Sequence, residues 1–248
     1  MSKLSFAIPS KGRLKEKTEE WLSELGFPVS QIGGERGYQA EIAGLGEVEM
    51  RLLSAREIAQ GLIEGSLHAG VTGEDLLHDL APEGAGDFRV VRQLGFGGAD
   101  VIVAVPQAWL DVDTMADLEA AGAAFRKLHH RRLRVATKYM RLTRRFFAAK
   151  SVGEYRLVES AGATEAAPAT GAADVIVDIT STGATLRANG LKILDDGIIL
   201  KSEASFALSP TANWSAAAQA SCSRLLERIE PSSTPGAKNL LNTFLTQV

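Results

Sequence analysis

The sequence has only one cysteine, Cys222, and four histidines among its 248 residues. A single thiol excludes an internal disulfide and any cysteine-based metal cluster, and it is typical of a reducing compartment. The histidines, His68, His78, His129 and His130, show none of the spacings of a metal site, so we interpret them as surface residues. We expect a cytoplasmic protein whose own side chains hold no metal.

The chain also lacks long apolar runs and a strong excess of charge. Its longest apolar stretches, residues 101–105 and 175–177, have the length of strands, far short of the roughly 20 residues of a membrane helix. The segment before Pro9 is too poor in apolar residues for a signal-peptide core. With a net charge of −3, nothing draws the whole chain to nucleic acid or to an anionic membrane. We therefore expect neither partner, and any site for a polyanion must be local.

What the sequence does contain is an alternation of strand-like and helix-like segments in its first part. The predicted strands cover residues 4–9, 47–53 and 68–73, and the predicted helices cover residues 15–25, 55–63 and 74–80. Such alternation favours a mostly parallel sheet covered by helices.

The pattern changes after Phe88. Two strand-like runs, 88–96 and 99–106, are joined by Gly97 and Gly98 with no helix between them, which predicts a crossover into a second lobe. Further strands are predicted at 133–137, 155–160, 173–179 and 191–208, and helices at 111–122, 139–150, 182–190, 214–229 and 237–246.

We therefore predict an α/β fold of two lobes with mostly parallel sheets and a ligand site in the cleft between the lobes. Lobe I is predicted to cover residues 1–95 and 180–248, including the C-terminal helices, and lobe II residues 96–179.

One segment carries distinctive chemistry, the stretch VIVDITSTGAT at residues 175–185. A buried strand ends at Asp178 and is followed by a turn whose backbone N–H groups can face an anion. The turn is crowded with short donors, and its residues are Thr180, Ser181, Thr182, Gly183, Ala184 and Thr185. A hydroxyl-rich helix cap without a ligand is one interpretation. A phosphate site is the other, since four hydroxyls in six residues exceed what capping needs.

The spacing adds to the second interpretation. Enzymes that use phosphoribosyl pyrophosphate carry a loop of apolar residues, one or two acids and then a Thr/Ser-Thr-Gly-x-Thr/Ser run, and this stretch resembles it. Val177 occupies the first acidic position, which departs from the commonest fold class of such transferases. Asp178 at the edge of the loop suits a ribose diol or a magnesium-bound water.

Five motifs together resemble the ATP phosphoribosyltransferase family of histidine biosynthesis. They are IPSKGRL, GVTGEDLL, LGFGGADVIVAVP, LRVATKY and GATEAAPATGAADVIVDITSTGATLRANGLK, and they follow the family's order over roughly residues 4–205. The resemblance implies the fold of type II periplasmic binding proteins. It also implies a reaction of ATP with phosphoribosyl pyrophosphate, accompanied by Mg²⁺, that yields phosphoribosyl-ATP and pyrophosphate.

The resemblance also suggests partners. With about forty residues after Leu208, the chain is similar to the family's short form. That form implies a homodimer of the catalytic chain within a hetero-oligomer, together with a regulatory subunit that resembles the catalytic core of histidyl-tRNA synthetase.

Individual roles follow from the same resemblance. Lys11, Arg13 and Arg36 are implied as catalytic cations that stabilise the departing pyrophosphate, and Arg36 lies in a glycine-rich loop. The loop with Asp178 and residues 180–185 is implied to bind phosphoribosyl pyrophosphate.

Three further residues match positions that contact ATP: Asp75, Tyr139 and Glu165. Plain packing for the tyrosine and a helix-dipole contact for Glu165 stay open as alternatives.

Departures from the family concern the ATP contacts. Ser54, Glu57 and Ala59 stand where an arginine and an Asp-Ile-Pro run are common, His68 replaces an aspartate, and Arg141 replaces an asparagine. The basic segment 126–145 either cradles the ATP phosphates or is a solvated positive face. A two-lobed solute-binding protein, another phosphoribosyltransferase and a non-catalytic paralogue remain as alternative functions.

Overall fold

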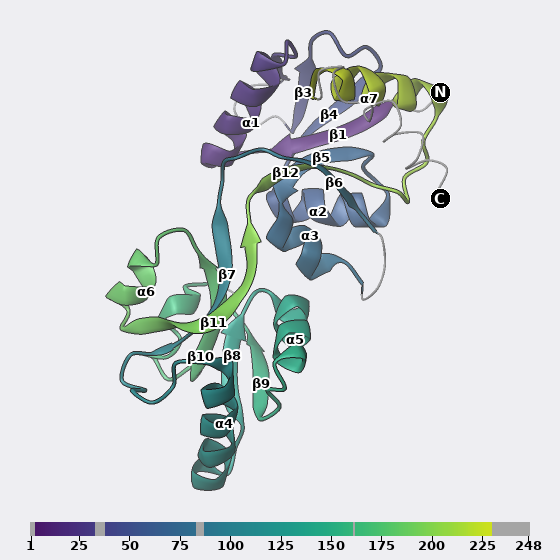
Figure 1. The fold of residues 1–248 in the computed structure, drawn as a ribbon. Helices are drawn as coiled ribbons and strands as arrows, with labels where there is room; N and C mark the ends of the chain where they lie inside the picture. Colours follow the sequence, from purple (N-terminus) through teal and green to yellow (C-terminus); the bar gives the residue numbers. More distant parts are fainter. Residues whose placement is uncertain (1–2, 33–37, 83–86, 161, 230–248) are drawn as a thin grey trace. The chain divides into compact units, whose positions relative to one another are not determined.

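A computed structural model of the chain describes residues 3–32, 38–82, 87–160 and 162–229. The chain forms two compact units, the first from Met1–Gly97 and Glu203–Val248 and the second from Gly98–Ser202. Figure 1 shows the elements of both units. The predicted helix over 237–246 lies outside the described residues. The predicted site between the lobes stays a prediction.

The first unit is built on a seven-stranded sheet with the order β2-β3-β4-β1-β5-β12-β6. Its strands are β1 (Leu4–Pro9), β2 (Val29–Ile32), β3 (Gln39–Ile42), β4 (Val48–Leu53), β5 (Ala69–Gly73), β6 (Arg89–Gln93) and β12 (Ala204–Leu208). β1 runs parallel to β4 and β5 at the centre, whereas β12 runs antiparallel to β5 and β6. The α/β fold is confirmed, and this sheet is mixed.

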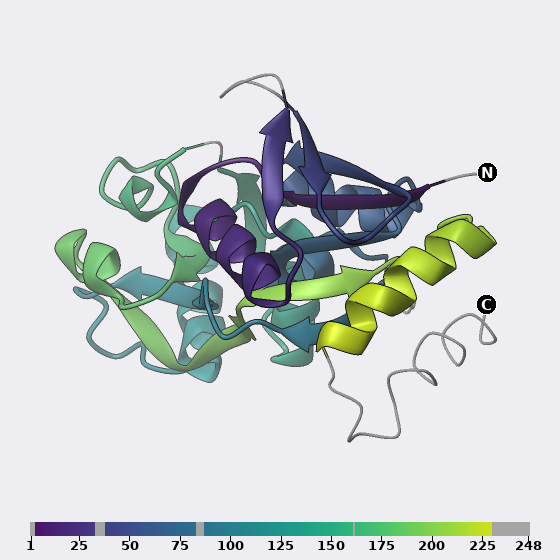
Figure 2. The ribbon, with the colours of Figure 1, turned by 90° about the horizontal axis from the view of Figure 1, so that it is seen from above.

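Helices cover both faces of this sheet: α1 (Gly12–Glu24), α2 (Ala55–Glu64), α3 (Glu74–Leu80) and α7 (Ala216–Ile229). Phe6 and its alternate neighbours in β1 pack against Leu22 of α1 and Leu225 of α7, a face seen from above in Figure 2. Ala7, on the opposite face, packs against Ile58 of α2. β1 is therefore buried along its whole length, which explains why its sequence is continuously apolar.

The second unit has a five-stranded sheet with the order β11-β7-β10-β8-β9. Its elements are β7 (Ala99–Pro106), α4 (Met115–His129), β8 (Leu133–Thr137), α5 (Met140–Ala149), β9 (Tyr155–Glu159), the 3₁₀ turn η1 (Thr164–Ala166), β10 (Val175–Thr180), α6 (Ala184–Ala188) and β11 (Leu191–Ser202). β10 is parallel to β8 and antiparallel to β7. Ile176 packs with Leu186 of α6 on one face, and Val177 is fully buried on the other.

The return crossover differs from the prediction. Lobe I was expected to resume at residue 180, but the chain re-enters the first unit only at Glu203. The reason is β11, which pairs antiparallel with β7 from Leu191 opposite Pro106 to Ser202 opposite Ala99. Those hydrogen bonds keep residues 180–202, including the hydroxyl-rich loop, in the second unit.

The interpretation of the histidines as surface residues is wrong for His68. Its side chain is 8% exposed, its Nδ1 accepts the Ser5 N–H at 3.0 Å, and its Nε2 lies 3.0 Å from the Asn213 carbonyl oxygen. The ring also stands edge-on to Trp214. His68 therefore joins the start of β5 to β1 and to the segment before α7.

Cys222 is fully buried in α7, where burial raises the pKa of its thiol to about 12. The thiol therefore packs as a small apolar group. Within the described part of the chain, every helix is too short or too polar to span a bilayer.

Candidate active site

The hydroxyl-rich loop joins β10 to α6 in the second unit. Val175, Ile176 and Val177 are fully buried, and the strand reaches the surface at Asp178 and Ile179. Gly183 then adopts a left-handed conformation with φ of 70° at the N-cap of α6. A Cβ at this position would lie 2.9 Å from the Arg187 Nη1 atom, so the turn requires glycine for both its φ and its space.

The structure divides the loop's hydroxyls between internal bonds and solvent. The Thr180 Oγ1 accepts the Gly183 N–H at 2.8 Å, and the Thr182 Oγ1 accepts the Ala184 N–H at 3.3 Å. The Ser181 Oγ donates to the Gly98 carbonyl at 2.8 Å. Among the described residues the Thr185 hydroxyl has no hydrogen-bond partner. Two hydroxyls therefore make hydrogen bonds within the turn that leads into α6, although the N-cap residue Gly183 itself offers no side-chain cap, and a third hydroxyl holds the loop in place.

A hollow of about 390 Å³ lies beside this loop, entirely within the second unit. Its lining is formed by the loop, the end of β10, the start of β7 and the 3₁₀ turn, and comprises Ala99, Glu165, Asp178, Ile179, Thr180, Ser181, Thr182, Thr185 and Leu186. Carboxylates and hydroxyls dominate its polar surface. This chemistry suits a sugar phosphate, whose diol meets the acids while its phosphate meets the short donors.

Asp178 is one of the two acids that line this hollow. Burial raises the pKa of its carboxyl above the ordinary value, and the charge of Glu165 adds to the rise. The Ile179 N–H, which donates to Oδ1 at 2.9 Å, and the Lys138 ammonium act against it. The ionised form of such a partly desolvated carboxylate is stabilised when a ligand brings hydroxyl donors or positive charge next to it.

Glu165 belongs to the 3₁₀ turn η1, outside the loop, and lines the same hollow as Asp178. Val177, at the position where the commoner transferases carry a second acid, is instead fully buried in the sheet. The second acid of this hollow therefore comes from a segment outside the loop. The sequence pointed to Glu165 only through the resemblance and assigned it to ATP.

Two cations predicted from the sequence lie at the carboxyl end of β1 in the first unit. Lys11 is the N-cap of α1 and Arg13 lies in its first turn, and both side chains are exposed. No side chain caps this helix, and its first turn contains no acid. The helix start therefore offers free N–H groups and two cations to an anion.

Asp75 lies at the same edge, because β5 is the parallel neighbour of β1. It is 8% exposed. The sequence missed the adjacent Glu74, whose Oε1 accepts the Ser205 hydroxyl at 2.6 Å and the Gln93 amide at 2.7 Å. The start of α3 is thus held by buried polar contacts to β6 and β12, a long-range arrangement without a local sequence signal.

The remaining predicted residues lie apart from the hollow or outside the described part of the chain. Tyr139 is 5% exposed, so its ring packs inside the second unit, in line with the packing alternative. Ser54 forms a capping box with Glu57 at the start of α2, which gives this departure from the family a local structural role. Arg36 lies outside the described residues.

The basic segment 126–145 is largely paired within the second unit. Arg131 and Arg134 contact Asp174, and Arg126 and Arg132 contact Glu154. Burial opposes ionisation of Asp174, but the two guanidinium groups hold its pKa well below the usual range. These arginines therefore belong to structural ion pairs more than to an open cradle for phosphates.

No group of three or more histidine, cysteine, aspartate or glutamate side chains suited to a metal ion occurs within residues 3–32, 38–82, 87–160 and 162–229. The hollow does offer two carboxylates and several hydroxyls, which are hard oxygen donors of the kind that Mg²⁺ and its bound waters prefer. A magnesium ion that arrives on a substrate's phosphates fits these donors.

Comparisons with known proteins agree on one family. The sequence model of the family described as ATP phosphoribosyltransferase matches residues 54–231. A protein of that name from Caulobacter vibrioides is 55% identical over 231 residues, which cover 93% of this chain and 72% of the relative. One from Rhodopseudomonas palustris is 55% identical over 224 residues, 90% of this chain and 69% of the relative.

A solved structure supports the fold. The ATP phosphoribosyl transferase (HisG:HisZ) complex from Thermotoga maritima contains a chain that matches with a TM-score of 0.63 at 21% identity, over 99% of this chain and 100% of that one.

Proposed function

The chain belongs to the ATP phosphoribosyltransferase family, and we propose from this premise which of its residues carry the reaction. The family's enzymes join ATP to phosphoribosyl pyrophosphate and release pyrophosphate, the first step of histidine biosynthesis. The observation that carries our assignment is the hollow in which Asp178, Glu165 and the loop hydroxyls meet.

Phosphoribosyl pyrophosphate is the ligand we assign to this hollow. Its 5′-phosphate would take the N–H groups of the turn and the Thr185 hydroxyl, which is unbonded among the described residues. A phosphate oxygen there would compete with the Thr182 hydroxyl for the Ala184 N–H, whose bond of 3.3 Å is the weaker of the loop's two internal caps. Asp178 and Glu165 would accept hydrogen bonds from the ribose hydroxyls.

The reaction needs positioning and charge compensation more than a covalent nucleophile. A nitrogen of the ATP adenine ring attacks the anomeric carbon, and the bond to pyrophosphate breaks as positive charge develops on the sugar. We assign the stabilisation of that charge to the Asp178 carboxylate, whose partial desolvation would strengthen the effect. Lys11 and Arg13 remain our candidates for neutralising the departing pyrophosphate, and Arg36 remains a sequence-based candidate.

Magnesium is proposed as the cation that accompanies the pyrophosphate. Asp178 and Glu165 are the side chains that would hold its waters, and the ion would supply neutralisation of the phosphate charge.

For ATP, Asp75 and Tyr139 stay proposals from the resemblance. The buried position of the Tyr139 ring supports an indirect role, in which it shapes the start of α5.

We also propose that the chain works in the cytoplasm with a regulatory subunit resembling the catalytic core of histidyl-tRNA synthetase. The Thermotoga structure, whose name includes a second component, supports looking for such a partner. The test is to co-purify candidate subunits with the full chain and to assay the chain with and without them. An unchanged rate with every such subunit would contradict the proposal.

The enzymatic assignment is tested by incubating the full chain with ATP, phosphoribosyl pyrophosphate and Mg²⁺, with the partner subunit present. We expect phosphoribosyl-ATP, detected as rising ultraviolet absorbance and confirmed by mass spectrometry. Binding of each substrate is measured separately by calorimetry. Binding of both substrates without product would overturn the catalytic assignment, and binding of a solute without either substrate would favour a binding protein.

A further inference from the structure

The basic segment 126–145 contains a lysine that the ion pairs of the second unit leave unused. Lys138 is exposed, and it makes neither an ion pair nor a hydrogen bond with any described residue. It differs in this from Arg131 and Arg134 of the same segment, which are both bound to Asp174. The positive charge of Lys138 is therefore available to an anionic ligand.

The second sheet places Lys138 next to Asp178. The strands β8 and β10 run parallel, and the last pair of their ladder joins Thr137 to Val177. Lys138 and Asp178 are the residues that follow, so the two chains carry them side by side at the carboxyl end of the strands. This end is the one at which parallel sheets bind their ligands.

Asp178 and Lys138 are close enough for their charges to interact. Burial raises the pKa of the Asp178 carboxyl, and the Lys138 ammonium acts in the opposite direction. The two side chains nevertheless form no ion pair with each other. The acid that lines the hollow and the neighbouring lysine are thus both able to contact a ligand lying over the end of β10.

The hydroxyl-rich loop and Lys138 lie on opposite flanks of β10. In the sheet, β10 has β7 on one side and β8 on the other. The loop is tied to the β7 side, where the Ser181 hydroxyl donates to the Gly98 carbonyl and where Ala99 joins the lining of the hollow. Lys138 continues β8. A ligand that crosses the end of β10 therefore meets the loop, then Asp178, then Lys138.

Phosphoribosyl pyrophosphate carries its groups in a matching order. Its 5′-phosphate and its anomeric pyrophosphate extend from opposite ends of the ribose, with the two ring hydroxyls between them. In the assignment above, the 5′-phosphate lies at the loop and the hydroxyls at Asp178 and Glu165. The anomeric pyrophosphate then falls on the flank of Lys138.

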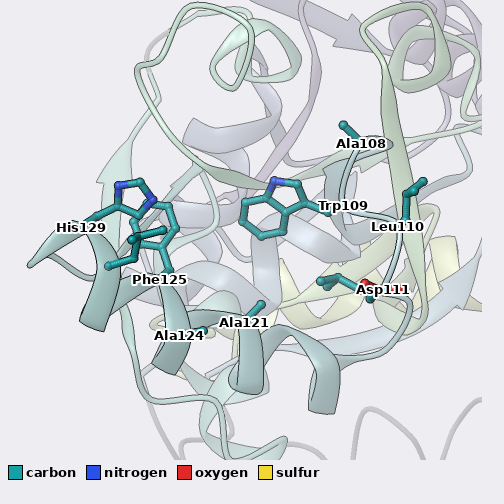
Figure 3. A pocket seen from close by; sticks show the side chains of 10 residues that line it. Ala108, Trp109, Leu110, Asp111, Ala121, Ala124, Phe125 and His129 are labelled. Atoms are coloured by element: carbon teal, nitrogen blue, oxygen red, sulfur yellow. The ribbon is translucent and has the colours of Figure 1, made fainter.

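A second hollow of this unit does not offer such chemistry. It measures about 550 Å³ and lies between the segment after β7 and the helix α4. Figure 3 shows the Trp109 indole and the Phe125 ring in its lining, which is mostly apolar and includes the acid Asp111. A polyphosphate would not be bound there, and Lys138 with the loop remains the better site for one.

We propose that Lys138 is a further catalytic residue, which binds the pyrophosphate of phosphoribosyl pyrophosphate and neutralises it as it leaves. Because the position of the ribose is taken from the proposed function, this role of Lys138 rests on it. As the bond to the anomeric carbon breaks, its electron pair stays on the pyrophosphate, and the Lys138 ammonium donates a hydrogen bond to that group. The second unit then supplies a cation of its own for the leaving group, in addition to Lys11 and Arg13.

Calorimetry with four probes tests where the Lys138 side chain acts. The probes are phosphoribosyl pyrophosphate, ribose 5-phosphate, inorganic pyrophosphate and ATP, each titrated with Mg²⁺ into the full chain. For Lys138→Ala we expect the affinity for phosphoribosyl pyrophosphate and for pyrophosphate to fall about 10-fold, as for one charge-assisted hydrogen bond. The affinities for ribose 5-phosphate and for ATP should stay the same. Lys138→Arg keeps the charge and should stay within about 3-fold of the unchanged chain.

Steady-state rates test the catalytic part of the role. The contact should strengthen as the pyrophosphate gains charge, so Lys138→Ala should also lower kcat about 10-fold. Lys127→Ala is the matched control, because this lysine is likewise exposed and unpaired among the described residues but lies in the last turn of α4, ahead of the amino end of β8. It should change neither the affinities nor kcat. Circular dichroism checks that each variant is folded.

Several results would overturn this role of Lys138. Unchanged affinity for phosphoribosyl pyrophosphate, or an unchanged kcat, would remove it, and an equal loss in Lys127→Ala would indicate a long-range effect of charge. An equal loss for ribose 5-phosphate would show that the lysine acts only on Asp178, and a loss for ATP alone would assign it to the triphosphate. If the unchanged chain bound neither phosphoribosyl pyrophosphate nor ribose 5-phosphate, the proposed function itself would fail, which is a different result from all of these.

Discussion

The Ser181 hydroxyl donates a hydrogen bond of 2.8 Å to the carbonyl oxygen of Gly98, although the two residues are 83 positions apart. Gly98 is the first residue of the second unit, directly after the crossover, and Ser181 lies in the middle of the hydroxyl-rich loop. The crossover into the unit and the candidate phosphate loop are thus joined by one side chain. Ser181 acts on the loop's position more than on a ligand.

Removing this bond should loosen the loop without removing its donors. For Ser181→Ala we expect the affinity for phosphoribosyl pyrophosphate to fall about 5-fold, the effect of one neutral hydrogen bond of about 1 kcal/mol. Calorimetry should show unchanged affinity for ATP. Ser23→Ala, at an exposed position on α1, is the control. Equal loss of both affinities would point to general destabilisation.

The double substitution Thr182→Ala with Thr185→Ala removes one cap and the hydroxyl that is unbonded in the described structure. We expect a loss of about 30-fold in affinity for phosphoribosyl pyrophosphate, mainly from the charge-assisted hydrogen bond that the Thr185 hydroxyl donates to the phosphate, and little change for ATP. The matched control is Thr170→Ala, an exposed threonine of the same unit that bonds only to backbone carbonyls. If ATP weakened as much, the loop would be wrongly assigned.

Asp178→Asn should separate stability from binding. Burial raises the folded-state pKa of Asp178, so its contribution to stability is fully present below the unfolded pKa and is lost as pH rises through the folded pKa. At pH 7 the ionised carboxylate of Asp178 therefore lowers the stability of the folded protein in the absence of ligand. The amide should raise the melting temperature there, and the gain should disappear near pH 3.

The same substitution should weaken binding of phosphoribosyl pyrophosphate about 30-fold, since the amide oxygen accepts from the ribose hydroxyls more weakly than the carboxylate does. Thermal scans between pH 3 and pH 7, with and without the ligand, test both effects. A variant less stable than the unchanged chain at pH 7 would contradict the desolvation argument, and unchanged affinity would contradict the ribose assignment.

Arg13→Ala tests the cation at the start of α1. If Arg13 contacts pyrophosphate more strongly as it departs, the substitution should lower kcat about 100-fold and change the KM for ATP little. Lys17→Ala removes another exposed cation of α1, which pairs with Glu20, and should leave both constants unchanged. A rise in KM with unchanged kcat would indicate a contact made equally with the bound substrate.

The central strands were predictable because their burial leaves a continuous apolar signature. β1 is buried on both faces and reads LSFAIP, and the sequence placed it at the observed residues. The strands β2 and β3 were not predicted, since each has only four residues and half of them are polar, for example Ser30 and Glu41. Short, half-exposed strands at or next to the edge of a sheet carry too little local signal.

The return crossover illustrates a different limit. β11 and β12 are separated by Glu203 alone, so no turn residues mark the passage between units. The unit to which each strand belongs is decided by its pairing partner: β11 pairs with β7 in the second unit, and β12 pairs with β5 in the first. These pairing partners lie far apart in the sequence, so local sequence patterns do not predict them.

In the candidate site too, local features were predictable from the sequence and long-range contacts were not. The loop's glycine and hydroxyls were recognised from spacing, but the use of each hydroxyl depends on partners such as Gly98. His68 was misread for this reason, since its acceptor oxygen belongs to Asn213, 145 residues later.

Glu165 offers the sharpest test of the site, because sequence and structure suggest different ligands for it. The resemblance assigned it to ATP, whereas it lines the hollow with Asp178 and raises that residue's pKa through its charge, after the larger effect of burial. If it accepts a ribose hydroxyl, Glu165→Gln should raise the KM for phosphoribosyl pyrophosphate about 10-fold, as for one hydrogen bond to a charged group.

The KM for ATP should stay constant in this variant. Glu159→Gln, an exposed acid at the end of β9, is the control for a general loss of negative charge in the unit. An acid at the position of Val177 could not replace Glu165, because a carboxylate at this fully buried position would be desolvated in the sheet. A KM that rises for ATP alone would restore the assignment made from the sequence and leave Asp178 as the only acid for the ribose.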